Sequence, residues 1–513
     1  MAKAEVFNRQ HNLYGENSDL WELYFNAALG GENFVNSDNL FTHRLEDGTD
    51  YDQRLERAYY LNFCDAVPEI YNTYIFKENV ERPPDGNLEF FRKNADSRGS
   101  SIADIIRKAG YFSSIYGVMY IFVDISSSTK KVPSKADIKA EGILPYCSLV
   151  HPTDLVDWSL DNKGIFNWVI MKEQYSKDSD PEVEREDETH FRVITREKWW
   201  IVDSDGKSVT YEDGTESSGN NEIGLIPLVT MYHRDLLSDH VGQSMLKDIV
   251  YINRAIMNWC SCLDEQIERQ AFSQLIMPDD GTLSEDRESG GDPLHKAGTA
   301  SILTFAHDAS NPPQFISPNV ENMSIIWSFC VDHIKEIYRL SGLLGGTGDL
   351  YTSRSGRQSQ MSFVGVNSSL ASKAAAYQKA ENSISKLALM FMNVDIASYN
   401  DVKYPSTFDV VGLAEEIDGQ LKILERNFSE TLNKAMMKDI SRKAVPMVSN
   451  DIRAAIEQEI DSGTGKVETL TTGGSEITNE KDGEGNPNSN QSNSLKTKEA
   501  KDKEESSHEV EKE

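Results

Sequence analysis

Two long apolar stripes, separated by a stretch rich in glycine and proline, constrain the fold of this chain more than any other feature. Within each stripe the apolar side chains recur three or four residues apart, which places them on one side of an α-helix. The first stripe contains Ile249, Ile252, Ile256, Trp259 and Leu263, and the second contains Ile326, Cys330, Ile334 and Ile337. Their similar lengths predict two helices, residues 241–272 and 319–342, that pack against each other along these side chains.

The segment between the stripes, residues 273–318, is predicted to fold as a compact α/β insert. Prolines and glycines interrupt it, and Ser301–Phe305 has the composition of a short strand. Its acidic side chains are Asp279, Asp280, Glu285, Asp286 and Glu288. Such an acidic run is as consistent with a plain solvated surface as with a docking surface for another protein.

Residues 343–366, after the second stripe, are rich in glycine, serine and threonine, a composition typical of a mobile loop. The segment has no Gly-Lys-Ser/Thr signature and follows a predicted helix rather than a strand, so a nucleotide-binding P-loop is not indicated. Its polar side chains include Thr347, Arg354, Arg357, Gln358, Ser359, Gln360 and Ser362.

The sequence before the first stripe combines helices with strands, which predicts an α+β fold. A helix kinked at Pro68 is expected across residues 51–79, and a second helix is expected over residues 102–116. Val118–Ile125 is continuously apolar, as in a buried strand. Alternating short stretches between residues 144 and 232 predict a β-rich module with a hairpin turn at Asp205 and Gly206.

The sequence after residue 366 is predicted to be mainly helical. We expect a long helix followed by an extended segment over residues 367–411, and a further helix over residues 412–443. Asn450 is expected to cap a last short helix, residues 451–460. Residues 461–513 contain no aromatic side chain and are expected to be disordered.

The charge and the missing motifs argue against an enzyme and against a protein that grips nucleic acid. With 52 basic and 83 acidic residues the chain carries a formal charge of −31, which repels a phosphate backbone. His233–Leu236 matches the start of a protein-kinase catalytic loop, but the position of the magnesium-binding Asn holds His240. Five cysteines without a Cys-x-x-Cys pair indicate free thiols rather than a zinc site. We therefore predict no cofactor, metal or catalytic residue.

The chain also shows no sign of a membrane segment. Its first residues lack the apolar core of a signal peptide, and no window approaches the roughly 18 uninterrupted apolar residues of a membrane span. The expectation is a protein made and kept in a cytoplasm, with no membrane partner.

The order of these elements resembles the portal protein, or head-to-tail connector, of tailed bacteriophages. The resemblance extends over about residues 20 to 460, and Ser244–Pro278 and Asn319–Asp349 carry it best. It implies a mainly helical portal fold with these parts. The N-terminal part would consist of the wing (1–240), the first stem helix (241–272), the clip (273–318) and the second stem helix (319–342). The C-terminal part would consist of the channel (tunnel) loop (343–366), a long wing helix with an extended segment (367–411), the crown (412–460) and the tail (461–513).

The resemblance implies a ring of twelve subunits at one capsid vertex of a virion assembled in the host cytoplasm. Such a ring conducts double-stranded DNA during packaging and ejection, without sequence specificity, and docks a terminase motor and then a tail adaptor. Major capsid and scaffolding proteins are further implied partners. In this interpretation the polar residues of the channel loop face DNA, and the acidic residues of the clip meet the motor.

Several alternatives stay open at this stage. The residues of 343–366 are equally consistent with an ordinary solvated loop. The whole chain is also consistent with another multimeric helical scaffold, or with an enzyme whose nucleotide or metal site escapes motif analysis.

Overall fold

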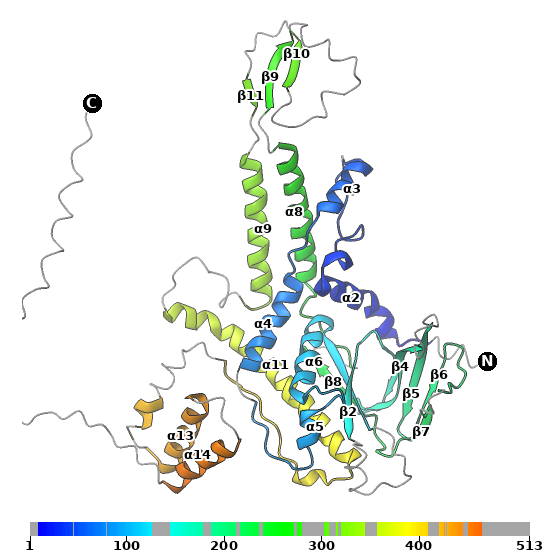
Figure 1. Cartoon of the computed structure of the whole chain (residues 1–513), viewed down its shortest axis with the longest axis vertical. Coiled ribbons are helices and arrows are strands. Elements are labelled where there is room, and N and C mark those ends of the chain that lie inside the picture. Colours follow the sequence, from blue (N-terminus) through cyan, green and yellow to red (C-terminus); the bar gives the residue numbers. More distant parts are fainter. Residues whose placement is uncertain are drawn as a thin grey trace, which may run out of the picture. The chain divides into compact units, whose positions relative to one another are not determined.

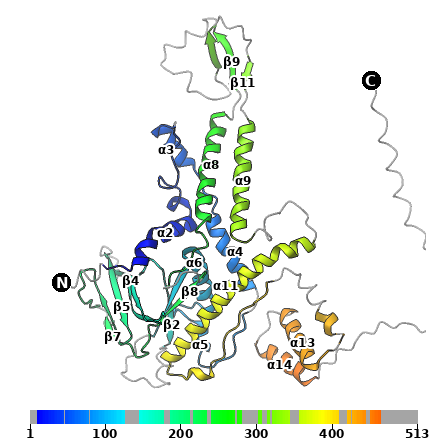
Figure 2. The same cartoon turned by 180° about the vertical axis from the view of Figure 1, so that it is seen from behind.

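The computed structural model describes sixteen stretches of the chain. These are residues 9–44, 46–77, 80–125, 144–177, 186–211, 216–234, 240–270, 274–279, 302–306, 314–316, 320–343, 356–408, 420–424, 426, 428–444 and 450–463. The chain divides into two compact units, Met1–Val410 and Val411–Glu513. Helices and mostly antiparallel sheets share the first unit, so the protein is of the α+β class (Figures 1 and 2).

The N-terminal helices of the first unit are α2 (Asn12–Leu29), η1 (Gly31–Asn33), α3 (Gly48–Arg57), α4 (Phe63–Lys77), α5 (Glu89–Lys93) and α6 (Ile102–Tyr116). The prediction of one kinked helix across 51–79 is wrong, because the chain leaves the helix at Ala58 and re-enters it at Phe63. Pro68 lies buried inside α4. Helix α6 has the predicted bounds and starts with a capping box formed by Ser101 and Asp104.

Two antiparallel sheets form the β part of the first unit. The first sheet has the order β2 (Pro145–Val150), β1 (Val118–Ile125), β8 (Leu228–Tyr232), and its central strand is buried as predicted. The second consists of β3 (Leu155–Leu160), β4 (Phe166–Lys177), β5 (Glu186–Thr195), β6 (Lys198–Val202) and β7 (Ser218–Asn220), in that order. The predicted turn is confirmed, since Gly206 adopts φ 75° and its N–H donates to the Asp203 carbonyl. These strands confirm the β-rich module.

The two striped helices are α8 (Ile249–Gln270) and α9 (Val320–Leu340), which lie side by side in both views (Figures 1 and 2). Helix α8 begins later than the predicted residue 241. The reason is a close approach of two backbones, because a Cβ atom on Gly117 or Gly242 would collide with the main chain of the other segment. Gly117 also ends α6 at φ 92°, so this contact joins the end of α6 to the entrance of α8.

Between α8 and α9 the described residues form a three-stranded mixed sheet. Strand β9 (Gln274–Asp279) pairs in parallel with β10 (Ile302–Ala306) and antiparallel with β11 (Gln314–Ile316). Strand β10 overlaps the strand expected at Ser301–Phe305. None of the described residues of 273–318 is helical, so here the structure supports the β part of the predicted α/β insert.

Helix α11 (Gly356–Phe391) includes the last part of the segment 343–366, which was predicted to be a loop. Arg357, Gln358, Ser359, Gln360 and Ser362 belong to its first turns, and the loop assignment is wrong for them. Arginine and glutamine are good helix formers, and their helix propensity outweighs that of the neighbouring glycines and serines here. Thr347 and Arg354 lie outside the described residues. The helix is followed by η4 (Ile396–Ser398) and an extended segment bridged to Glu81 through Lys403.

The second unit contains α13 (Glu430–Ala444) and α14 (Asn450–Ser462), joined by ion pairs from Arg442 to Glu457 at 2.8 Å and from Lys438 to Asp461 at 2.6 Å. The continuous helix expected over 412–443 is wrong, because residues 420–424 form a separate helical turn before α13. Asn450 is the first helical residue rather than the cap. None of the helices in the described ranges is both long and apolar enough to cross a lipid bilayer.

Candidate functional site

Most predicted residues of the two stripes meet where α8 packs against α9 and the adjoining core. Ile249, Ile256, Leu263, Cys330 and Ile337 are buried, while Ile252, Ile326 and Ile334 are partly buried. The Cys260 thiol contacts that of Cys330 across the pair, and burial raises the pKa of Cys260 to about 12. The two helices therefore form the packed pair that the spacing predicted.

Trp259 differs from the rest of the first stripe because it lies at the edge of the pair. Its side chain is 43% exposed, and its ring meets that of Phe329 edge-on at a centroid distance of 6.0 Å. Trp259 thus touches α9 without being enclosed by it.

A second side of α8 is covered by the chain between α2 and α4. The Asn253 amide donates to the Leu61 carbonyl at 2.8 Å and accepts from the Phe63 N–H and the Tyr60 hydroxyl, each at 3.0 Å. These bonds hold the break between α3 and α4. They explain why the kinked single helix fails.

The same side of α8 is held further along by Asn258 and Ser261. The Asn258 side chain accepts from the Phe41 N–H and donates to the Asn39 carbonyl, both at 2.8 Å. Buried Arg54 donates to the Ser261 hydroxyl at 2.8 Å and pairs with Glu46 at 2.6 Å. Helix α8 is therefore fixed by polar contacts on one side and apolar contacts on another.

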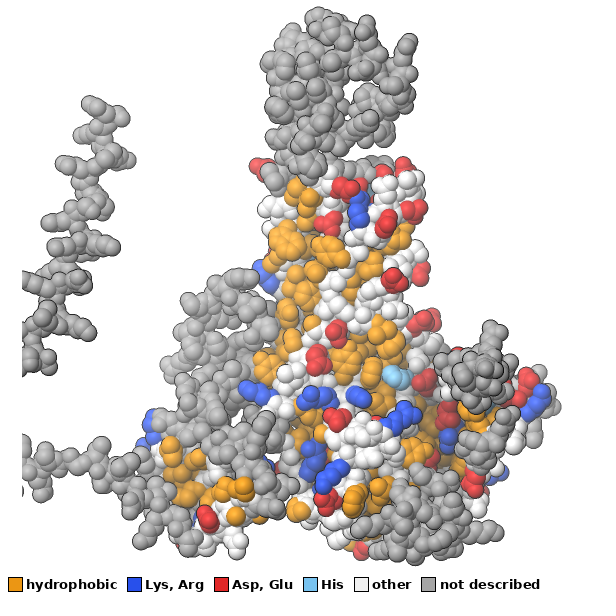
Figure 3. All heavy atoms as spheres, in the orientation of Figure 1, with side chains coloured by type: hydrophobic (Ala, Val, Ile, Leu, Met, Phe, Trp, Pro, Cys, Tyr) orange, Lys and Arg blue, Asp and Glu red, His pale blue; other side chains and the backbone are white. Residues whose placement is uncertain are grey.

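The remaining surface of the helix pair carries large apolar side chains with little cover. We name this surface the stem face and define it by Trp259, Ile267, Ile325, Trp327 and Phe329. Ile325 is 67% exposed, and the other four are between 43% and 48% exposed. Figure 3 shows hydrophobic side chains along the α8–α9 part of the molecule. Trp259 contacts Phe329, and Ile325 lies one turn before Phe329 on the same side of α9, whereas Trp327 projects from another side of that helix. Exposed apolar side chains that gather in this way are more typical of an interaction surface than of a solvated one.

The predicted acidic docking residues fall mostly outside what the structure describes. Asp279 is the last residue of β9, while Asp280, Glu285, Asp286 and Glu288 lie outside the described residues. Their role as a docking surface stays a prediction.

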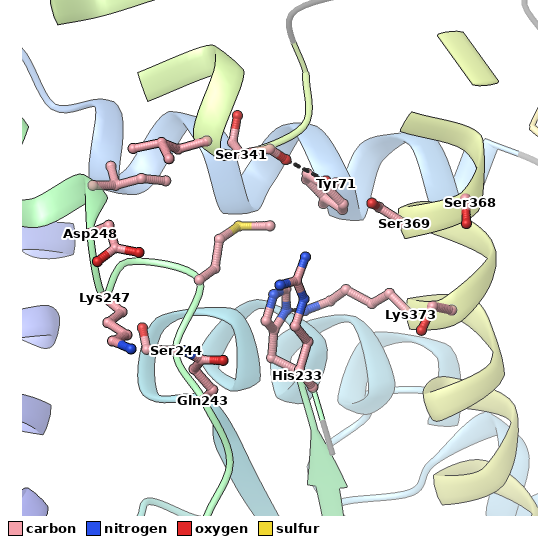
Figure 4. A pocket seen from close by; sticks show the side chains of 15 residues that line it. Tyr71, His233, Gln243, Ser244, Lys247, Asp248, Ser341, Ser368, Ser369 and Lys373 are labelled. Atoms are coloured by element: carbon pink, nitrogen blue, oxygen red, sulfur yellow. Dashed lines mark hydrogen bonds between the residues drawn. The ribbon is translucent and has the colours of Figure 1, made fainter. Parts of the chain in front are cut away.

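A polar pocket of about 230 Å³ lies where the base of α8 meets α4, α11 and the end of β8 (Figure 4). Lys373 of α11 reaches into it and meets His233, the first residue after β8. Arg234 and Lys247 also line the pocket, whose one acidic lining residue is Asp248.

Lys373 is 2% exposed, and its ammonium group has only neutral neighbours for hydrogen bonding. It donates to the Ser114 hydroxyl and to His233 Nδ1, the latter at 2.9 Å, and lies 5.6 Å from the centre of the Tyr377 ring. No described carboxylate forms an ion pair with it. Burial lowers the pKa of Lys373 well below its usual value. Burial and the nearby Lys373 and Arg234 likewise lower the pKa of His233.

The structure gives no support to phosphotransfer at His233–Leu236. His240, at the position of the magnesium-binding residue, is engaged with the Thr230 hydroxyl at 2.6 Å and the Gly164 carbonyl at 2.9 Å. Asp235 lies outside the described residues. Across the described ranges, no group of three or more His, Cys, Asp or Glu side chains is placed to hold a metal ion.

No protein-family model matches the chain, and no curated protein matches its sequence.

The pocket and its lysine were not predicted from the sequence. A signal was available, because Lys373 follows Leu370 by three residues and precedes Tyr377 by four. It therefore falls on the buried stripe of α11. A charged residue at such a position needs a partner or a function.

Proposed function

We propose that this chain is the subunit of a closed ring-shaped assembly that works through shape and charge rather than catalysis. The stem face carries the proposal, because two packed helices leave a second set of large apolar side chains uncovered. If the stem face packs on a different surface of a neighbouring copy, the same contact repeats from subunit to subunit and can close into a ring.

Within that class, we propose a portal subunit of a tailed bacteriophage. The order of elements supports it, since a helical and β-rich region precedes α8, a small sheet separates α8 from α9, and a long helix and a separate helical unit follow. In this proposal α8 and α9 are the stem, β9, β10 and β11 belong to the clip, and the second unit contains the crown. The ring would occupy a capsid vertex and conduct double-stranded DNA during packaging and ejection.

The charge of the chain supports a conduit over a DNA-binding protein. At a formal charge of −31, a wall built from these subunits would repel a phosphate polymer and let it pass with little retention. Arg354 and Arg357 would supply weak phosphate contacts to steady the DNA. The clip would dock the terminase motor and then the tail adaptor, while other surfaces would meet capsid and scaffolding proteins.

Negative-stain electron microscopy of the purified protein tests the proposal. We expect rings with a central channel. Monomers or irregular oligomers at every concentration would contradict the proposal. Rings of more than one subunit count are compatible with it, because scaffold partners are absent from such a preparation.

Matched variants then test the stem face itself. Ile325→Asp combined with Phe329→Asp should abolish rings, because each introduces a charge into an apolar contact. Ile165→Asp is the control, since Ile165 is an exposed hydrophobic residue in the turn between β3 and β4. Rings that persist in the double variant would show that the stem face is not the subunit contact.

A further inference from the structure

The polar pocket at the base of α8 concentrates positive charge in an otherwise acidic chain. Lys373, Arg234 and Lys247 line it together with His233, against the single exposed carboxylate of Asp248. Among the described residues, none of the three cationic side chains forms an ion pair. Their excess charge is therefore available to a ligand.

Lys373 holds an unused donor at the buried end of the pocket. Protonated Lys373 has three N–H donors, and the described acceptors are two, the Ser114 hydroxyl and His233 Nδ1. Burial without an anion favours the neutral amine, and a bound anion would favour the protonated form that carries the third donor. His233 accepts with Nδ1 when its imidazole is neutral, so it adds no competing charge. Burying a charged lysine without an anion lowers the free energy of unfolding. An anion that accepts the third hydrogen bond would offset this loss.

The open side of the pocket offers further donors from the same two segments that carry Lys373 and His233. Ser368 and Ser372 lie one turn apart on α11 and are exposed, and Arg234 brings a guanidinium from the end of β8. The hydroxyl of Ser244, by contrast, is already engaged with the Ile115 carbonyl and the Leu246 N–H. The free donors therefore come from α11 and from the segment after β8, and they approach from different directions.

This arrangement defines the chemistry of the ligand. A carboxylate presents two oxygens in one plane, whereas a phosphate group presents oxygens in several directions and carries more charge. Donors from separate elements and an excess of cations suit the second geometry. We propose that the pocket formed by Lys373, His233, Arg234 and Ser372 binds a phosphate group, either as a free phosphate ion or as a phosphodiester of nucleic acid. The proposal does not rest on the portal function.

Isothermal titration of the full chain with inorganic phosphate tests the proposal, with sodium chloride at equal ionic strength as reference. We expect saturable binding of phosphate and none of chloride. Lys373→Met should weaken binding by about tenfold or more, since hydrogen bonds to charged groups are the strong ones. Lys379→Met, an exposed lysine on the same helix, should bind phosphate like the unmodified protein.

Arg234→Gln tests the pocket from its exposed side and avoids any effect of Lys373 on folding. It should weaken phosphate binding while the melting temperature without phosphate stays unchanged. Phosphate binding that is equal in Lys373→Met, Arg234→Gln and the unmodified protein would overturn the proposal, as would a response no larger than that to chloride.

A short oligothymidylate separates the two sources of phosphate. Binding that is lost in Arg234→Gln and that competes with inorganic phosphate would assign the pocket to a nucleic-acid backbone. Binding of inorganic phosphate without the oligonucleotide would assign it to the free ion.

Discussion

Helices α9 and α11 depart from the usual rules of burial in opposite directions. Helix α9 leaves large apolar side chains in contact with solvent, including Ile325 at 67% exposure. Helix α11 encloses charged side chains, with Lys373 at 2% and Glu381 at 0% exposure. An exposed apolar surface is covered by another molecule, whereas a buried charge needs a partner within reach. In the proposed assembly α9 would therefore face a neighbouring subunit, whereas α11 belongs to the core of this chain.

The two buried charges of α11 also differ from each other. Glu381 is fully satisfied, since Arg82 donates to it at 2.7 Å and the Tyr404 hydroxyl donates at 2.6 Å. Lys373, two turns earlier, has only neutral partners. Glu381 is therefore a structural residue, and Lys373 is the group for which a ligand is expected.

The largest effect should follow removal of the satisfied charge. Glu381→Ala removes the buried carboxylate that pairs with Arg82, whose side chain is 23% exposed. The loss of folding free energy should therefore lie near the lower end of the about 3–5 kcal/mol that breaking a buried pair costs. The measurement is urea unfolding of the variant and the unmodified protein. Glu336→Ala is the control, because the Glu336–Arg339 pair is exposed on α9 and should contribute little. Equal losses of unfolding free energy in both variants would contradict the distinction between a buried charge on α11 and an exposed one on α9.

The two sides of α9 should respond differently to truncation. Ile337 is fully buried, so Ile337→Ala should cost about 2–5 kcal/mol through lost contacts and a cavity. Ile325→Ala should change the stability of the isolated subunit by less than about 0.5 kcal/mol. Both are measured by urea unfolding at concentrations below those at which rings form. A large loss in Ile325→Ala would mean that its side chain is covered within the subunit.

The pH dependence of stability should report Lys373. Because burial lowers its pKa, the unfolded chain binds a proton at this lysine over a range where the folded chain does not. Stability then rises as pH approaches the usual lysine pKa. Lys373→Met lacks this contribution. In phosphate-free buffer its free energy of unfolding should exceed that of the unmodified protein at about pH 7, and this advantage should shrink toward about pH 10.

The neighbours of Lys373 do not titrate in that interval in a way that reverses the sign. His233 has a lowered pKa and changes charge at lower pH, and Tyr71 and Tyr377 have raised pKa values. An advantage of Lys373→Met that is constant over the interval would show that Lys373 is not kept neutral by burial.

The smallest effect concerns the contact between α8 and α9. With the pKa of Cys260 at about 12, little thiolate forms at pH 8, and the contact with Cys330 further limits access. Labelling of native protein with a disulfide reagent should therefore be far slower at Cys260 than in unfolded protein. Rapid labelling at this position would reveal that α8 and α9 separate readily.

Local patterns predicted those elements whose form depends on their own residues. The spacing of apolar side chains placed α6, α8 and α9, and the continuous apolar run placed β1. Failures occurred where distant residues decide, as at Ala58–Asn62, which Asn253 holds out of the helix. The spacing of apolar residues also predicts which side of a helix is apolar. It does not predict that other large apolar side chains of α8 and α9 stay exposed. The contacts of Lys373 join positions 114, 233 and 373, which no local pattern connects.

The three hydrogen bonds of Asn253 have a consequence for which sequences this fold accepts. Aspartate is nearly equal in size but cannot donate to the Leu61 carbonyl, and leucine fills the space but makes none of the three hydrogen bonds. Glutamine carries the right groups one methylene too far. In a library randomised at this codon and selected for folded protein, asparagine should therefore dominate, although nothing about its place in a helix would single it out.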